Sequence, residues 1–228
     1  LQQNKIHKGT HAGVHVTDGG KGKFAGNEIV CNTGFGVVVD GAGSDPFFLE
    51  NNISDGLGGG MAFRNSGGGT VDQNKLTGNA AEHVLVESGA DPAFTKNRIF
   101  GGEGDGIVVQ QNGLGTFSGN DVYDIGSADN HRCGVCVSTC GHPTFRGNTI
   151  RDIHGTGVEC REAGKGCFED NEIFRNFGAA FGCASSGDPT VKNNQIHGGL
   201  AAGVLVHDGG LAPSKGTASA STSLPTWR

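Results

Sequence analysis

The residues best placed for chemistry are two aspartates on either side of the one long spacing in an otherwise regular repeat. Asp124 and Asp152 each stand four residues after a recurring asparagine, so neighbouring repeats would place them at equivalent positions. Carboxylates stacked about 5 Å apart repel each other unless a proton or a cation lies between them. With His131 and Arg151 nearby, the pair could bind Ca²⁺ and remove a proton next to a substrate carboxylate. Alternatively, both aspartates are turn residues that face water.

The cysteines could offer a second chemistry, metal binding. Cys133, Cys136 and Cys140 resemble part of a zinc site, but strand alternation turns Cys136 outward and no second pair follows at finger spacing. Cys160 and Cys183 fall at the same inward position of neighbouring repeats. We therefore expect reduced, buried thiols, no metal or other cofactor, and an intracellular (cytoplasmic) location.

The elements that must position these residues form a repeat anchored on asparagine. The motif Asn-x-Ile, with Leu or Val as variants of Ile, recurs at spacings of 23, 24, 23, 23, 23, 28, 23 and 23 residues. Its asparagines are Asn4, Asn27, Asn51, Asn74, Asn97, Asn120, Asn148, Asn171 and Asn194. A Phe or Val precedes each asparagine by three residues from the second copy on. A period in this range indicates a solenoid.

Short apolar alternation after each asparagine predicts strands. The commonest pattern is Gly-Val-x-Val, and such runs with period two and β-branched residues are typical of strands. One copy is too short to bury its own apolar face, so copies must stack. The sequence thus predicts an all-β fold, a single-stranded parallel β-helix of about nine 23-residue coils. Side chains such as Phe94, Ile99, Ile107 and Val109 should point inward.

The repeat also sets the boundaries. We expect one β-helix domain over residues 1–210, and a degenerate coil or cap with a low-complexity tail over residues 211–228. The five extra residues in the long spacing should form an exposed loop over residues 125–132, after which the coil resumes in register at Cys133. Opposite charges recur in register on outward positions, for example Arg98 and Asp121, and should pair between coils.

Composition excludes two classes of partner. With 17 basic and 23 acidic residues, the net charge is −6, and there is no basic face for nucleic acid. No apolar run approaches the length of about 18 residues that a membrane-spanning helix needs.

An outward apolar stripe is the main candidate binding surface. The central outward residues of four consecutive coils are Val38, Ala62, Leu85 and Val108, where an exposed strand should be mostly polar. Contiguous apolar surface usually meets a partner, so we expect this stripe to bind protein. Alternatively, another segment of a parent protein covers it.

Three segments carry a resemblance to known repeats. Gly113–Phe117 reads Gly-Leu-Gly-Thr-Phe, Ala90–Phe94 reads Ala-Asp-Pro-Ala-Phe, and Gly187–Val191 is similar. Each leads into Asn-x-Ile, as in the right-handed parallel β-helix repeats of the pectate lyase-like superfamily, and the coils are most similar to those of the F-box only protein 11 type. The resemblance implies a right-handed helix and a role in binding proteins.

Three functions stay open on the sequence. The favoured hypothesis is a non-catalytic protein-binding scaffold, the substrate-recognition part of a larger F-box-like or multi-subunit assembly. The alternative is a carbohydrate-active enzyme, a polyuronate lyase or epimerase that uses Asp124 and Asp152, because resembling lyases place their cleft beside such an insertion. The second alternative is a structural spacer in a large complex. The balance favours a protein without catalytic activity.

Overall fold

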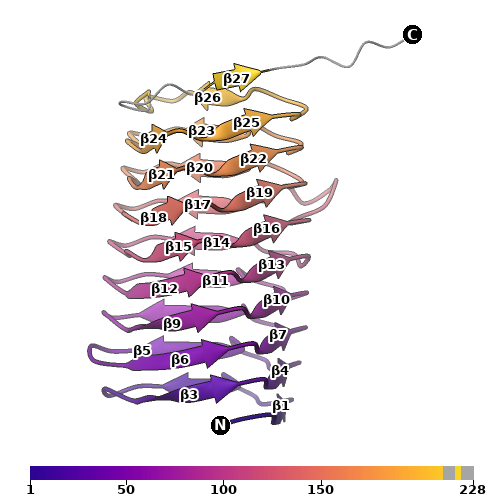
Figure 1. Cartoon of the computed structure of the whole chain (residues 1–228), viewed down its shortest axis with the longest axis vertical. Coiled ribbons are helices and arrows are strands. Elements are labelled where there is room, and N and C mark those ends of the chain that lie inside the picture. Colours follow the sequence, from indigo (N-terminus) through magenta and orange to yellow (C-terminus); the bar gives the residue numbers. More distant parts are fainter. Residues whose placement is uncertain (213–218, 222–228) are drawn as a thin grey trace.

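The computed structural model describes residues 1–212 and 219–221, and it confirms the predicted fold. Three parallel sheets wrap around one core in a right-handed solenoid of about nine coils (Figure 1). Every regular element in the described part of the chain is a strand. No helix long and apolar enough to cross a membrane occurs among the residues described.

Each complete coil contributes one strand to each sheet. Sheet I contains β1 (Lys5–His7), β4 (Glu28–Val30), β7 (Asn52–Ser54), β10 (Lys75–Thr77), β13 (Arg98–Phe100), β16 (Asp121–Tyr123), β19 (Thr149–Arg151), β22 (Glu172–Phe174), β25 (Gln195–His197) and β27 (Ser219–Ser221). Sheet II contains β2 (Val14–Val16), β5 (Val37–Asp40), β8 (Met61–Arg64), β11 (Val84–Val86), β14 (Ile107–Val109), β17 (Val135–Val137), β20 (Val158–Cys160), β23 (Phe181–Cys183) and β26 (Val204–Val206). Sheet III contains β3 (Lys21–Ala25), β6 (Asp45–Leu49), β9 (Gly68–Asp72), β12 (Asp91–Thr95), β15 (Thr116–Ser118), β18 (Thr144–Arg146), β21 (Cys167–Glu169) and β24 (Thr190–Lys192).

The core consists of columns of identical or similar side chains. In the interior coils, the two alternating inward residues of sheet II and the central residue of sheet I are fully or almost fully buried. Phenylalanines of sheet III stack along the axis, with ring centroids 5.1 Å apart for Phe94 and Phe117 and 4.4 Å apart for Phe117 and Phe145. Phe94, Ile99, Ile107 and Val109 all point inward as predicted.

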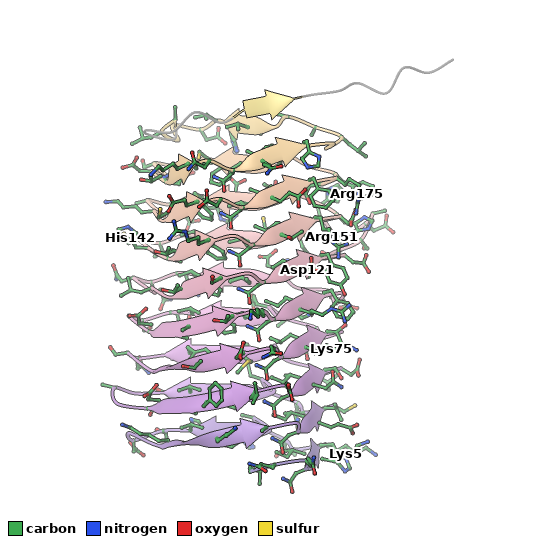
Figure 2. The ribbon with its side chains drawn as sticks, viewed as in Figure 1. Lys5, Lys75, Asp121, His142, Arg151 and Arg175 are labelled. Atoms are coloured by element: carbon green, nitrogen blue, oxygen red, sulfur yellow. The ribbon has the colours of Figure 1, made fainter. Side chains whose placement is uncertain are left out.

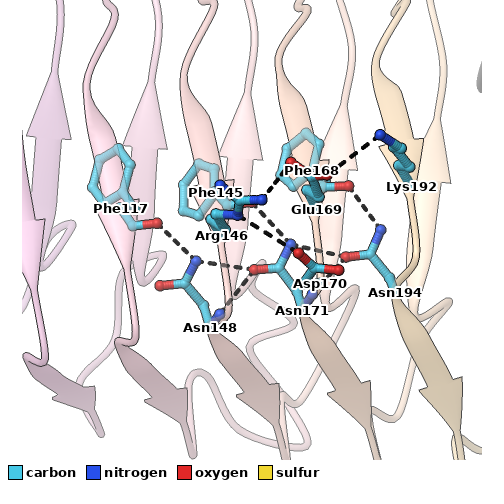
Figure 3. Close-up of polar contacts among 10 residues, drawn as sticks. All are labelled: Phe117, Phe145, Arg146, Asn148, Phe168, Glu169, Asp170, Asn171, Lys192 and Asn194. Atoms are coloured by element: carbon cyan, nitrogen blue, oxygen red, sulfur yellow. Dashed lines mark hydrogen bonds and ion pairs between the residues drawn. The ribbon is translucent and has the colours of Figure 1, made fainter.

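An asparagine ladder fixes the turn between sheets III and I. From Asn27 on, Oδ1 of each ladder asparagine accepts hydrogen bonds from the backbone N and the Nδ2 of the asparagine one coil earlier, at 2.8–3.2 Å. In Figure 3, Nδ2 of Asn148 also donates to the carbonyl of Phe117 at 2.9 Å. The side chains thereby satisfy buried backbone groups that the turn removes from the sheets.

The inserted segment closes as a small hairpin and leaves the coil register unchanged. Ser127 and Asn130 exchange two backbone hydrogen bonds, and Asn130 Nδ2 donates to the Glu103 carbonyl at 2.9 Å. The next strand pairs in register, with Val135 opposite Ile107. The prediction of an exposed loop over residues 125–132 is wrong for one residue. Ile125 is fully buried, because it fills the corner of the core before the chain turns outward.

Opposite charges pair between coils on the outer faces, as expected. Arg146, Glu169 and Lys192 form a ladder, with N–O distances of 3.4 and 3.5 Å (Figure 3). The pairing of Arg98 with Asp121 is wrong, although their Cα atoms are in register. Asp121 bonds Arg151 at 2.9 Å instead, one coil further on.

Among the described residues, sheet I has one more rung than sheet II at the C-terminal end. β27 pairs with β25 in register, whereas β26 is the last strand of sheet II in the part of the chain that the structure describes. The predicted domain boundary falls at this end, and the tail assigned to residues 211–228 lies mostly outside the described residues.

Candidate functional site

Of the two candidate carboxylates, Asp152 is bound by two arginines. Asp124 and Asp152 each follow a strand of sheet I in a left-handed turn conformation, one residue beyond the register pair Tyr123 and Arg151. Arg175 donates to both oxygens of Asp152 at 2.7 Å, and Arg151 donates to Oδ2 at 2.9 Å. The hydrogen bonds from Arg175, followed by those from Arg151, lower the pKa of Asp152. A carboxylate held in this way is a weak base and has few lone pairs left for Ca²⁺.

The other two residues of the expected lyase site also have partners of their own. Arg151 bonds Asp121 and Asp152 and lies over the Tyr123 ring, with Cζ 4.2 Å from its centroid. His131 is exposed, and its Nε2 is 3.1 Å from the Ala128 carbonyl within the loop. Figure 2 shows Asp121, Arg151 and Arg175 along one edge of the solenoid. Among the described residues, no three His, Cys, Asp or Glu side chains form a group that could hold a metal.

The cysteine cluster is divided between the surface and a buried site. Cys136 points outward from sheet II, opposite Val108, as the strand alternation predicts, yet it is almost fully buried. Burial raises the pKa of the Cys136 thiol to about 11. Cys140 lies in an exposed turn beyond the strand. Cys160 and Cys183 face each other inward, both fully buried.

The apolar stripe lies on the outer face of sheet II, but the expectation that it is exposed is wrong. Ala62 is fully buried, and Leu85 and Val108 are each only 7% exposed. These residues form a second cluster, separate from the core, against which Val38 and Phe35 pack. The Phe35 ring occupies the space that a side chain at Gly59 would take, and the Arg64 guanidinium lies over that ring at 5.3 Å. Side chains of the same face therefore cover most of the stripe.

An aromatic and cationic ladder on the outer face of sheet I was missed from the sequence. It consists of Phe100, Tyr123, Arg151, Phe174 and His197, the third residue after five consecutive ladder asparagines. The ring centroids are 4.7 Å apart for Phe100 and Tyr123 and 5.1 Å apart for Phe174 and His197. Because the rings stack on one another along the axis, their faces are occupied and mainly their edges meet solvent. The ladder is thus poorly suited to stack against sugars.

An exposed patch at the corner after sheet I was also missed. We name His154, Phe177 and Leu200 the corner patch. They are the sixth residues after three consecutive ladder asparagines, and this shared position is the signal that could have revealed them. Phe177 is 48% exposed and Leu200 75% exposed, and the Phe177 ring stacks on His154 at 4.4 Å. Among the residues that the structure describes, Phe177 and Leu200 are exposed large apolar side chains at the same lateral position of consecutive coils.

His83 is a buried imidazole at a position where most other coils have glycine. It is fully buried, and its ring lies where a side chain at Gly102 would otherwise project. Neither ring nitrogen has a hydrogen-bond partner at good geometry, although the Asp105 and Phe100 carbonyls face the ring. Burial lowers the pKa of His83 from 6.5 to about 4, and the two carbonyls offset only part of that effect.

The buried imidazole predicts a loss of stability in mild acid. Between pH 6.5 and about 4, the unfolded chain binds a proton at His83 that the folded chain does not. Unfolding is therefore favoured as the pH falls through this window, by about 3 kcal/mol in total. Urea unfolding of the His83→Gln variant should show a correspondingly weaker pH dependence than the unmodified chain. The exposed His131→Gln serves as control. Equal pH dependence of the chain and His83→Gln would contradict the assignment.

Comparison with known families agrees with this architecture. The family model described as “Right handed beta helix region” matches residues 1–129 and 104–222 of the chain. No solved structure matches the chain. Since the two matched ranges together span nearly the whole sequence, the chain belongs to the right-handed β-helix family.

Proposed function

We propose that the chain is a non-catalytic scaffold that binds a protein partner through the corner patch. The observation that carries this proposal is the exposure of Phe177 and Leu200 on consecutive coils of a rigid solenoid. A single exposed leucine needs no explanation, but an aromatic and a leucine stacked in register form continuous apolar surface. The stripe at Leu85 and Val108 offers a partner far less area.

The surroundings of the corner patch favour a protein ligand. Phe174 lies in the same coil as Phe177, with the Arg175 guanidinium 4.6 Å from its ring centroid. Aromatic and arginine side chains dominate the energetics of protein interfaces. Hydrogen bonds to Asp152 hold Arg175 in place, so little side-chain entropy is lost on binding. We expect the partner to insert an apolar side chain between Phe177 and Leu200.

The engaged state of Asp152 argues against the alternative of a polyuronate lyase or epimerase. The role of substrate-recognition part in an F-box-like or other multi-subunit assembly stays a prediction. It requires that the protein retained by the corner patch belong to such an assembly or be its substrate.

Introducing positive charges into the corner patch should abolish partner binding. In the double variant Phe177→Lys and Leu200→Lys, both side chains stay in water, so the unfolding midpoint should change little. Leu57→Lys is the matched control, because Leu57 occupies the same corner position five coils before Phe177 and is 73% exposed.

The measurement is photo-crosslinking in cell extract with benzoylphenylalanine at position 177 or at position 57. The proposal is supported if a discrete adduct forms with the probe at position 177 but not at position 57. The protein in that adduct should also bind the Leu57→Lys chain and should not bind the double variant. The proposal is refuted if the unmodified chain, Leu57→Lys and the double variant all bind the same proteins. It is also refuted if no adduct forms at position 177. An adduct with a second copy of the chain would also refute it.

A further inference from the structure

The inserted hairpin is the largest irregularity of the repeat spacing, and it is held in place on both sides. Within it, Ser127 and Asn130 exchange two backbone hydrogen bonds at 3.0 and 3.2 Å. On one side, Asn130 Nδ2 donates to the Glu103 carbonyl at 2.9 Å. On the other side, the backbone N of Arg132 donates to the His154 carbonyl at 3.3 Å. The hairpin therefore lies fixed between the coil that carries Glu103 and the coil that carries His154.

The hairpin stands on the same edge of the solenoid as the corner patch. Glu103 and His154 occupy the repeat position of Phe177, the sixth after a ladder asparagine. Figure 1 shows the insertion projecting beside β16 and β19, from the edge where the chain leaves sheet I. Along this edge, Glu103 lies on one side of the hairpin, and His154 and Phe177 lie on the other.

The edge is acidic at the hairpin and in the coils before it. Glu103, Asp124 and Asp129 are exposed, and Asp105 accepts a hydrogen bond from the Cys133 backbone N at 2.8 Å. The charged residues of segments 79–83, 101–106 and 124–132 are Glu82, Glu103, Asp105, Asp124, Asp129 and Arg132. None of these five carboxylates forms an ion pair within the described part of the chain. Carboxylates gathered without counter-charges create a negative potential that attracts cations.

The same edge is apolar beyond the hairpin. The His154 ring is half-buried under Phe177, which is 48% exposed. Asp152, the acid of the His154 coil, is bound by Arg151 and Arg175 and is thus neutralised. An edge that is acidic on one side of a rigid hairpin and apolar on the other is complementary to a segment with basic residues at one end and an apolar side chain at the other.

We propose that the partner segment that docks on the corner patch is basic. Its apolar side chain packs on Phe177, and its lysine or arginine residues pair with Glu103 and Asp129 across the hairpin. This inference rests on the proposed function and specifies the partner. Glu103 and Phe177 are three coils apart, which is about 14 Å at the strand spacing of a sheet. An extended segment spans that distance in about four residues, and this separates the basic from the apolar position.

The photo-crosslinking probe that tests the corner patch also tests this inference. Benzoylphenylalanine at position 177 and, in a separate chain, at the exposed hairpin position 128 should capture the same protein from cell extract. Mass spectrometry should locate both crosslinks in one segment, with Lys or Arg about four residues from the residue joined to position 177. Adducts with different proteins, or a captured segment without basic residues, would overturn the inference.

Charge reversal at the acidic end tests the electrostatic part. In the double variant Glu103→Lys and Asp129→Lys, the yield of the adduct at position 177 should fall about tenfold, because like charges then face each other. The matched control is Asp18→Lys with Glu50→Lys, which changes the net charge equally at two exposed turn positions away from this edge. The control should leave the yield unchanged, and circular dichroism should show that both double variants fold. Equal yields from the two would overturn the inference.

A salt series on the chain without these substitutions provides a readout that needs no charge variant to fold. The yield at position 177 should fall several-fold between about 0.01 and 0.15 M salt, because the Debye length shortens from about 30 to about 8 Å. A discrete adduct whose yield is indifferent to salt and to charge reversal would overturn the basic partner and leave the corner patch as a binding site. The absence of any adduct at position 177 would overturn the proposed function, and the basic partner with it.

Discussion

Replacing Asn97 with alanine is expected to destabilise the solenoid by about 4 kcal/mol, because two buried backbone groups lose their partners. Asn97 Oδ1 accepts from the Asn74 backbone N at 2.8 Å, and its Nδ2 donates to the Val71 carbonyl at 2.9 Å. Asn97 is fully buried in the turn, so these two backbone groups do not face bulk solvent. Urea denaturation, with the unfolding free energy extrapolated to water, measures the effect.

The control for this prediction is the same substitution at Asn52, an asparagine outside the ladder. Asn52 follows the ladder residue Asn51 but is partly exposed on the outer face of β7, and its Oδ1 bonds no other described group. Asn52→Ala should therefore change the unfolding free energy by less than about 1 kcal/mol. If both alanine variants lost the same stability, the ladder would be an incidental result of stacking and not a source of stability.

The fold could be predicted almost completely because each coil repeats the same physical requirements. Nine asparagines at one position imply one shared partner, and the ladder bonds from Asn4 to Asn194 provide it. The alternation that placed Ile107 and Val109 inward is local, so it survives a five-residue insertion without error. Ile125 was assigned to the loop because most coils have Gly or Asn at this repeat position, although Ile153, at the same position of the next coil, is buried in the same way.

The surface was less predictable, because exposure depends on neighbours outside the strand. Alternation correctly placed Leu85 outward, but it does not show that Phe35 folds over Gly59 and packs against the same cluster. For charges, register identifies facing Cα atoms but not which of two partners a long side chain selects. Asp121 has a cation in both flanking coils, and Arg151 rather than Arg98 bonds to it.

The candidate sites illustrate the same limit. Asp124 and Asp152 are equivalent in the repeat, and sequence spacing alone suggested a carboxylate pair. Arg175, one coil further on at the same turn position, converts Asp152 into a structural ion-pair residue. The corner patch could have been predicted from the sequence, because Phe177 and Leu200 share one position of the repeat. A comparison of each turn column for apolar content would have found it.

Replacing Ile107 with aspartate is expected to have the largest effect of any single change proposed for this chain. Ile107 is fully buried in sheet II between Val84 and Val135. The substitution removes a large apolar side chain and places an unpaired carboxylate in the core, for a loss of at least about 5 kcal/mol. That loss is comparable to the entire stability of a typical domain, so the neighbouring coils should unfold at neutral pH.

The adjacent position provides the matched comparison. Val108 points to the other face of the same strand and belongs to the partly covered outer cluster. In Val108→Asp, the carboxylate lies on the outer face of the sheet and not in the core, so the loss should be about 1–3 kcal/mol and the chain should stay folded. Circular dichroism and limited proteolysis distinguish the two variants. Because coils contact only their neighbours, cleavage in Ile107→Asp should begin near residue 107 and spread towards both ends. Equal cleavage of both variants would mean that the two faces of sheet II are equally buried, and it would contradict the separation of the core from the outer cluster.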